Sequence, residues 1–94
     1  MVKLQANETV LIGEWQSVGD RVVGNEACER IHLLTSQYLE RVATDPSGWD
    51  KLYRDPGDER YWELTYPHSD WHGGGPPFLQ CISLAQARAT YGPI

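Results

Sequence analysis

The stretch LYRDPGDERYWELTY, residues 52–66, determines the fold that we expect for this chain. Residues 60–66 alternate with a period of two and are rich in aromatic residues, which is typical of a half-buried strand. The apolar face of this strand consists of Trp62, Leu64 and Tyr66. Residues 55–58, Asp-Pro-Gly-Asp, indicate a turn in which proline presets φ at the second position and glycine allows a positive φ at the third. We therefore predict a β-hairpin over residues 49–66.

The stretch before the hairpin, residues 25–44, has the periodicity of an amphipathic helix. Asn25 is a favourable N-cap, and acidic residues in the first turn complement the helix dipole. Apolar side chains recur at spacings of three and four and so share one face, formed by Ala27, Ile31, Leu34, Tyr38 and Val42. Pro46 cannot continue the helical hydrogen bonds. The pattern predicts one long helix over residues 25–44.

Shorter elements are expected at both ends of the chain. Residues 78–82 are predicted to be a strand, after which Ser83 begins a short helix with Gln86 as its capping-box partner. Near the N-terminus, residues 11–15 and 21–23 are strand candidates joined through a Gly19-Asp20 turn.

These elements predict an α+β fold in a single domain over residues 1–94. It is expected to have a small antiparallel sheet of three to five strands packed against one long helix, with a short C-terminal helix. Residues 1–10 are expected to be a loosely ordered N-terminal segment.

The charge of the chain limits its partners. It contains 8 Lys and Arg against 13 Asp and Glu, a net charge of −5 at pH 7. Because nucleic acids attract basic patches, binding to nucleic acid through bulk charge is excluded. No apolar run is long enough to cross a bilayer, and the N-terminus lacks the apolar segment of a secretory signal. We expect a cytoplasmic protein whose Cys28 and Cys81 are reduced and that has no contact with a membrane.

Three patterns that could support catalysis lack essential parts. His72-Gly73-Gly74-Gly75 resembles the oxyanion-hole string of some esterases, but the chain has no Gly-x-Ser-x-Gly nucleophile motif. His68, Asp70 and His72 would point the same way on an extended segment and could hold a metal, but no cysteine pair completes the set. Cys28 and His32 lie one helical turn apart with no third group to orient them. We therefore expect no catalytic residues and no cofactor.

Aromatic and acidic residues are interleaved within residues 49–71. Tyrosine and tryptophan frequently anchor protein interfaces, and acidic neighbours suit a basic protein surface rather than a nucleic acid. The residues that we predict to bind a partner are Asp55, Asp58, Glu59, Tyr61, Asp70 and Trp71.

Several strings occur together in a characteristic order. They are IGEW at 12–15, EACERI at 26–31, LYRDP at 52–56, RYWELTYP at 60–67, HGGGPP at 72–77 and AQAR at 85–88. In this order and spacing, the chain resembles the immunity protein 27 family of bacterial polymorphic-toxin systems from about residue 11 onwards. The family pattern has Asp where this chain has Asn25, and Gly where it has Glu59.

The resemblance implies a non-enzymatic, cytoplasmic immunity protein that neutralises a cognate toxin domain by stoichiometric binding. The expected toxin surface is basic, a nuclease being one candidate, and the chain is expected to be a monomer or a weak dimer. Specificity should reside in variable exposed positions such as Glu59 and Trp71. Two alternatives stay open from the residues alone: a small metal-dependent enzyme and a general protein-interaction domain.

Overall fold

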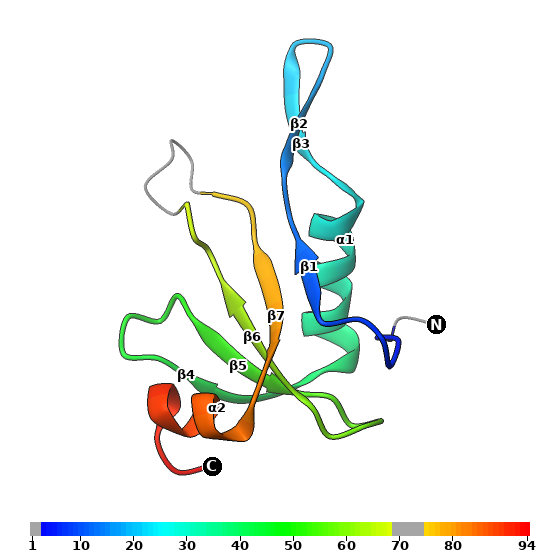
Figure 1. Ribbon diagram of the computed structural model, residues 1–94. Helices are drawn as coiled ribbons and strands as arrows, with labels where there is room; N and C mark the ends of the chain where they lie inside the picture. The colour runs from blue at the N-terminus through cyan, green and yellow to red at the C-terminus, as the bar shows by residue number, and fades with distance from the viewer. Residues whose placement is uncertain (1–2, 69–74) are drawn as a thin grey trace.

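The computed structural model describes residues 3–68 and 75–94, and in these residues the protein is mostly β-sheet. Five antiparallel strands form one sheet in the order β1-β7-β6-β5-β4, and β2 pairs with β3 in a separate hairpin that projects away from it (Figure 1). The strands are β1 (Val10–Ile12), β2 (Trp15–Val18), β3 (Arg21–Gly24), β4 (Glu40–Thr44), β5 (Lys51–Arg54), β6 (Tyr61–Thr65) and β7 (Phe78–Ile82). The helical segments are α1 (Glu26–Leu33), the π-helical turn η1 (Leu34–Tyr38) and α2 (Leu84–Tyr91).

The predicted hairpin is confirmed. Strands β5 and β6 pair antiparallel, with Tyr53 opposite Trp62 and Lys51 opposite Leu64. Trp62 is fully buried and Leu64 is 5% exposed, and both belong to the main hydrophobic core. The period-two pattern therefore identified the buried face correctly, because alternate side chains of a strand point to opposite sides of a sheet.

The conformation of the turn differs from the prediction. The positive φ, +66°, belongs to Glu59 and not to Gly57. The Glu59 N–H bonds to the Asp55 carbonyl at 2.8 Å, so the turn closes over five residues, and its last residue lies in the left-handed region. Gly57 is needed for space: a Cβ there would lie 2.8 Å from the Tyr38 hydroxyl.

The prediction of one long helix over residues 25–44 is wrong. Asn25 does cap α1, since its side chain accepts a hydrogen bond from the Cys28 N–H. The α-helix ends at Leu33, and η1 closes with a bond from the Leu39 N–H to the Leu34 carbonyl at 2.7 Å. Residues 40–44 then form strand β4. The α+β architecture with one long helix is thus corrected to a mostly sheet protein with short helices.

Local and tertiary interactions explain why the helix stops. The Thr35 and Ser36 hydroxyls bond to the carbonyls of Ile31 and His32, which weakens the helix at this point. Pairing of β4 with β5 then supplies hydrogen bonds to a stretch that contains β-branched Val42 and Thr44. Val42 lies at a β-bulge and is 39% exposed. Its spacing from the other apolar residues therefore suggested a buried helix face that it does not belong to.

The C-terminal elements agree with the prediction. Strand β7 covers residues 78–82, and Ser83 caps α2 in a complete capping box with Gln86. The helix ends at Tyr91 and is capped by Gly92, whose φ is +87°. Capping boxes and glycine C-caps depend on residues close together in sequence, which is why they could be predicted from the sequence.

The region before α1 contains the expected strands and the Gly19-Asp20 turn, but the strands belong to two different sheets. Gly13 separates them, and its N–H bonds to the Pro77 carbonyl at 2.9 Å. A Cβ on Gly13 would overlap with that carbonyl oxygen. The chain therefore leaves the large sheet at Gly13 and enters the projecting β2–β3 hairpin (Figure 1).

The two faces of the large sheet are covered differently. On one face, Ile31 and Leu34 of the α1–η1 segment pack with a cluster completed by Leu4, Leu39, Tyr53, Trp62, Leu64 and Leu79. On the other face, α2 lies near β6, where the Tyr91 hydroxyl donates to the Glu63 carboxylate at 2.8 Å. The N-terminal segment joins the first face through Leu4, and Glu8 forms an ion pair with Arg30.

Candidate functional site

Two surfaces are candidates for function, at opposite ends of strand β6. The first is the β5–β6 tip, residues 55–60, where three of the predicted partner-binding residues lie. The second is a pocket at the other end of β6, beside Pro67 and the start of β7. We describe the tip first and then the pocket.

Asp55 is a structural residue of the β5–β6 tip. Its side chain is 1% exposed and accepts hydrogen bonds from the Tyr38 hydroxyl at 2.6 Å and the Gly57 N–H at 2.7 Å. The hydrogen bond to Asp55 raises the pKa of Tyr38, with burial of the phenol as a further cause. Asp55 therefore holds the tip in shape, and its carboxylate is not accessible to a partner while these bonds persist.

Asp58 and Glu59 are exposed at the tip, and each faces an arginine. Glu59 Oε1 lies 2.5 Å from Arg54 Nη2, and Asp58 Oδ2 lies 2.6 Å from Arg60 Nε. Burial opposes ionisation of Asp58, yet hydrogen bonds from Arg60 hold its pKa below the usual value. The Glu59 side chain is 74% exposed, so water screens its ion pair with Arg54. The same exposure leaves the Glu59 carboxylate accessible to a partner.

The described aromatic residues of the 49–71 stretch, which include the predicted interface residue Tyr61, are dispersed. Tyr61 is half-buried on the α2 side of the sheet, opposite Ile82. Tyr53 is in the core, and exposed Trp49 packs edge-to-face against Tyr66 with 5.7 Å between ring centroids. Asp70 and Trp71 lie outside the described residues. Of the predicted set, the structure thus brings Asp58 and Glu59 to the tip with Tyr61 at the start of the adjoining strand.

In the part of the chain that the structure describes, the residues of the possible catalytic patterns do not assemble into a site. Cys28 Sγ donates to the Glu14 carbonyl at 3.6 Å, a bond that joins α1 to the β1–β2 junction. Residues 3–68 and 75–94 contain no cluster of three or more potential metal ligands, and Asp70 and His72 of the hypothetical metal site fall outside them. Gly75 packs so close to His68 that a Cβ would overlap with the His68 backbone.

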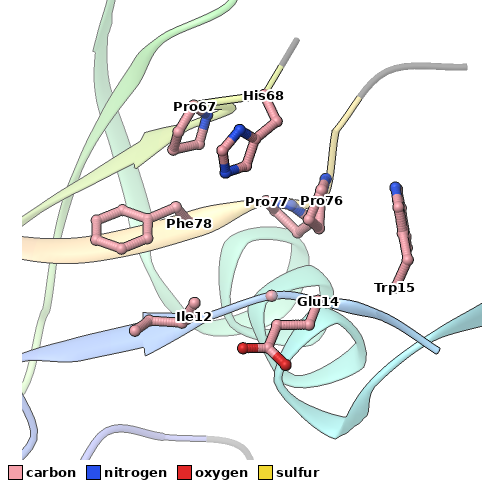
Figure 2. A pocket seen from close by; sticks show the side chains of 9 residues that line it. Ile12, Glu14, Trp15, Pro67, His68, Pro76, Pro77 and Phe78 are labelled. Carbon is pink, nitrogen blue, oxygen red and sulfur yellow. The ribbon is translucent and has the colours of Figure 1, made fainter. Parts of the chain in front are cut away.

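The pocket at the other end of β6 was missed by sequence reasoning. Its volume is about 390 Å³, and Figure 2 shows its lining side chains. It is lined by Ile12, Gly13, Glu14, Trp15, Pro67, His68, Pro76, Pro77 and Phe78. Three separate segments of the chain meet here, because β1 pairs with β7 and β7 pairs with β6.

Asn25 fixes the β1–β2 junction at the edge of this pocket. Its side-chain oxygen accepts from the Glu14 N–H at 3.2 Å as well as from Cys28, and its own N–H donates to the Glu14 carbonyl at 2.9 Å. The backbone of Glu14 is therefore held on both sides. The sequence feature that could have indicated this pocket is the IGEW string at 12–15. It forms a pocket only together with Pro76 and Pro77, which follow more than sixty residues later.

Exposed apolar side chains continue from the pocket onto the projecting hairpin. Ile12 is 52% exposed, Trp15 42%, Val18 55% and Val22 67%. In the β2–β3 register Trp15 and Val22 share one face of the hairpin, and Val18 points to the other. Exposed apolar residues that lie close together mark protein-binding surfaces. Together with the pocket, these residues give the molecule a surface suited to a protein partner.

The comparisons with known proteins agree with a protein-binding role. The model of a family described as immunity protein 27 matches residues 17–83 of the chain. No curated protein and no solved structure was found to match it. None of the helices in the described ranges is long and apolar enough to cross a membrane.

Proposed function

Because the chain belongs to the immunity protein 27 family, we propose that it binds a cognate toxin domain and neutralises it by forming a stoichiometric complex. The activity is one of binding, in the cytoplasm of the cell that makes the toxin or receives it from a neighbour. In the complex the active site of the toxin domain is blocked or distorted, so the toxin stays inactive for as long as the complex lasts. Neither catalysis nor a cofactor is part of the proposal.

The observation that carries this proposal is the exposed apolar surface beside the 390 Å³ pocket. It occurs in a chain that belongs to a family of immunity proteins. The centre of a protein interface is usually apolar and the rim polar. Ile12 and Trp15 supply apolar area of this kind. An exposed surface of this type favours a partner over an isolated monomeric function.

The acidic tip has a different part in the proposal. The net charge of −5 and the exposed carboxylates of Asp58 and Glu59 favour approach to a basic protein surface. We assign these residues, with Tyr61, Asp70 and Trp71, to contacts at the rim, where charge affects the rate of association more than affinity. A toxin that cleaves nucleic acid has such a basic surface, because it must bind phosphates.

The experiment is co-expression with the toxin domain encoded immediately upstream. The proposal predicts restored growth, a one-to-one complex on purification and nanomolar affinity by calorimetry. Growth arrest that persists, together with no complex between the purified proteins, would contradict it. A general interaction domain unconnected to toxins predicts neither the complex nor the restored growth.

A further inference from the structure

We propose that the pocket between the β1–β2 junction and the start of β7 binds one basic side chain, an arginine or a lysine, from the cognate toxin. The proposal rests on the proposed function and names the chemical contact at the centre of the complex. It places that contact at Glu14, with Ile12, Trp15 and Phe78 around it.

The walls of the pocket fit the aliphatic stem of such a side chain. Ile12 and Phe78 face each other directly across the β1–β7 pair and stand on the face of the sheet opposite the main core. Helix α2 covers this face only farther along, near Glu63, so Ile12 is left 52% exposed. Figure 2 shows Ile12 and Phe78 along one side of the pocket, with Pro76 and Pro77 beside them. Arginine and lysine side chains bury their methylene groups against apolar surface of this kind.

The charge inside the pocket selects a cation. Glu14 is exposed and is the one acidic residue among the residues that line the pocket; His68 is the other titratable lining residue, and among the described residues no lysine or arginine lines the pocket. No ion pair of Glu14 occurs within residues 3–68 and 75–94. A purely apolar group seated here would strip water from this carboxylate without replacing its hydrogen bonds, and an anion would repel it. A guanidinium or ammonium group at the pocket can pair with Glu14 while its aliphatic stem contacts the apolar walls.

Trp15 adds a second feature that favours a cation. Its ring stands at one end of the pocket, beyond Pro76 (Figure 2), and is 42% exposed. Tryptophan is the aromatic side chain that attracts cations most strongly through its ring face. The ring also lies close to Gly24 of the neighbouring strand, where a Cβ would be 3.5 Å from Trp15 Cζ3. Part of the Trp15 ring edge therefore lies against β3, while 42% of the residue stays exposed.

The backbone around Glu14 is fixed before any partner arrives. Asn25 holds it by hydrogen bonds to both its N–H and its carbonyl, and Gly13 bonds to Pro77. A preformed pocket loses little conformational entropy on binding, which strengthens the contact with a single inserted side chain. Glu14 also differs from Glu59 in having no ion pair within the described residues, whereas Glu59 is paired with Arg54.

The test compares Glu14→Gln and Glu14→Lys with Glu29→Lys in binding to the purified upstream toxin domain by calorimetry. Glu29 is exposed on α1 and does not line the pocket, so its variant matches the charge change of Glu14→Lys at another place. We expect Kd to rise about tenfold or more for Glu14→Gln and about a hundredfold or more for Glu14→Lys. Glu29→Lys is expected to stay within about threefold, and thermal unfolding checks that all three variants are folded.

Charge reversal on the toxin identifies the partner residue. Each exposed arginine and lysine of the toxin domain is changed to glutamate, and binding is measured against both wild-type protein and Glu14→Lys. The proposal predicts at least one toxin variant that binds wild type weakly and binds Glu14→Lys better. Such exchange of affinity requires the two charges to be close, because distant substitutions act additively.

Two results would overturn the assignment while leaving neutralisation intact. One is wild-type affinity for the toxin in both Glu14 variants. The other is a dimer of this chain, seen by sedimentation, that Glu14→Lys dissociates, because the pocket would then belong to a second copy. Failure of the wild-type protein to bind the toxin domain would instead remove the proposed function and this contact with it.

Discussion

The Tyr38 hydroxyl donates a 2.6 Å hydrogen bond to the buried carboxylate of Asp55, and so joins the end of the helical segment to the β5–β6 tip. The two residues are seventeen positions apart in the sequence. This contact explains why the Asp-Pro-Gly-Asp turn begins with a buried aspartate. It also leads to the first prediction.

Replacing Tyr38 by phenylalanine removes the donor and leaves Asp55 buried with fewer hydrogen bonds. We expect a loss of about 1–3 kcal/mol in the free energy of unfolding, measured by urea denaturation. In an Asp55→Asn background the same change should cost less, because the charged acceptor is already gone. Equal losses in the two backgrounds would show that the pair is not coupled.

Glu59 has a φ of +66°, where a side chain is strained and glycine is not. We compare Glu59→Gly with Glu59→Ala, since both lose the exposed ion pair with Arg54 and differ in backbone freedom. The glycine variant should be more stable than the alanine variant by about 1 kcal/mol in urea denaturation. If alanine proved as stable as glycine, the left-handed conformation of this position would be wrong.

Glu8 links the N-terminal segment to α1 through Arg30, and a side-chain hydrogen bond from Arg30 lowers the pKa of Glu8 to about 2. Its folded pKa lies below its unfolded value, so the stability it contributes is present above about pH 4.5 and is lost as the pH falls toward 2. Because both side chains are partly exposed, we expect Glu8→Gln to cost only about 1 kcal/mol at pH 7.

Urea denaturation at several pH values checks this prediction. The difference between wild type and Glu8→Gln should shrink steadily between pH 5 and pH 2, where the wild-type carboxylate becomes protonated. A difference that stays constant over this range would assign the effect of Glu8 to packing and not to charge.

The acidic tip is expected to act on association kinetics. Reversing Asp58 and Glu59 to lysine should slow association with the toxin domain about tenfold at low salt and flatten its dependence on ionic strength. Dissociation should change little, since rim charges act mainly on encounter. The matched control is Glu26→Lys/Glu29→Lys on α1, which alters net charge equally. Stopped-flow traces in which the tip variant and wild type coincide would exclude the tip from the interface.

The features predicted correctly from sequence depend on residues close together in the chain. The burial of Trp62 and Leu64 follows from the alternation of apolar and polar residues within one strand. Ser83 and Gln86 form a capping box that spans only four residues. The position of Val42 fits a helical apolar face as well as it fits a strand. Only the pairing of β4 with β5 determines that this stretch is a strand. Tertiary pairing overrode the local pattern there.

The candidate surfaces were harder to predict, because they depend on contacts between distant segments. Asp55 has the sequence context of an exposed turn, and its burial requires Tyr38. The pocket forms only when residues 12–15 meet residues 76–78 through the β1–β7 pair. Sequence periodicity carries no information about which strands become neighbours, so neither feature could be derived from it.

The measurement that tests the central claim most directly is a titration of toxin activity. A fixed concentration of the upstream toxin domain, well above the expected Kd, is mixed with increasing amounts of this protein, and its residual toxic activity is assayed. Neutralisation by binding predicts a linear fall that ends sharply at one equivalent, and activity that returns when the complex is denatured and the toxin is refolded alone. Complete inactivation by a small fraction of an equivalent, or full activity at a large excess, would contradict it.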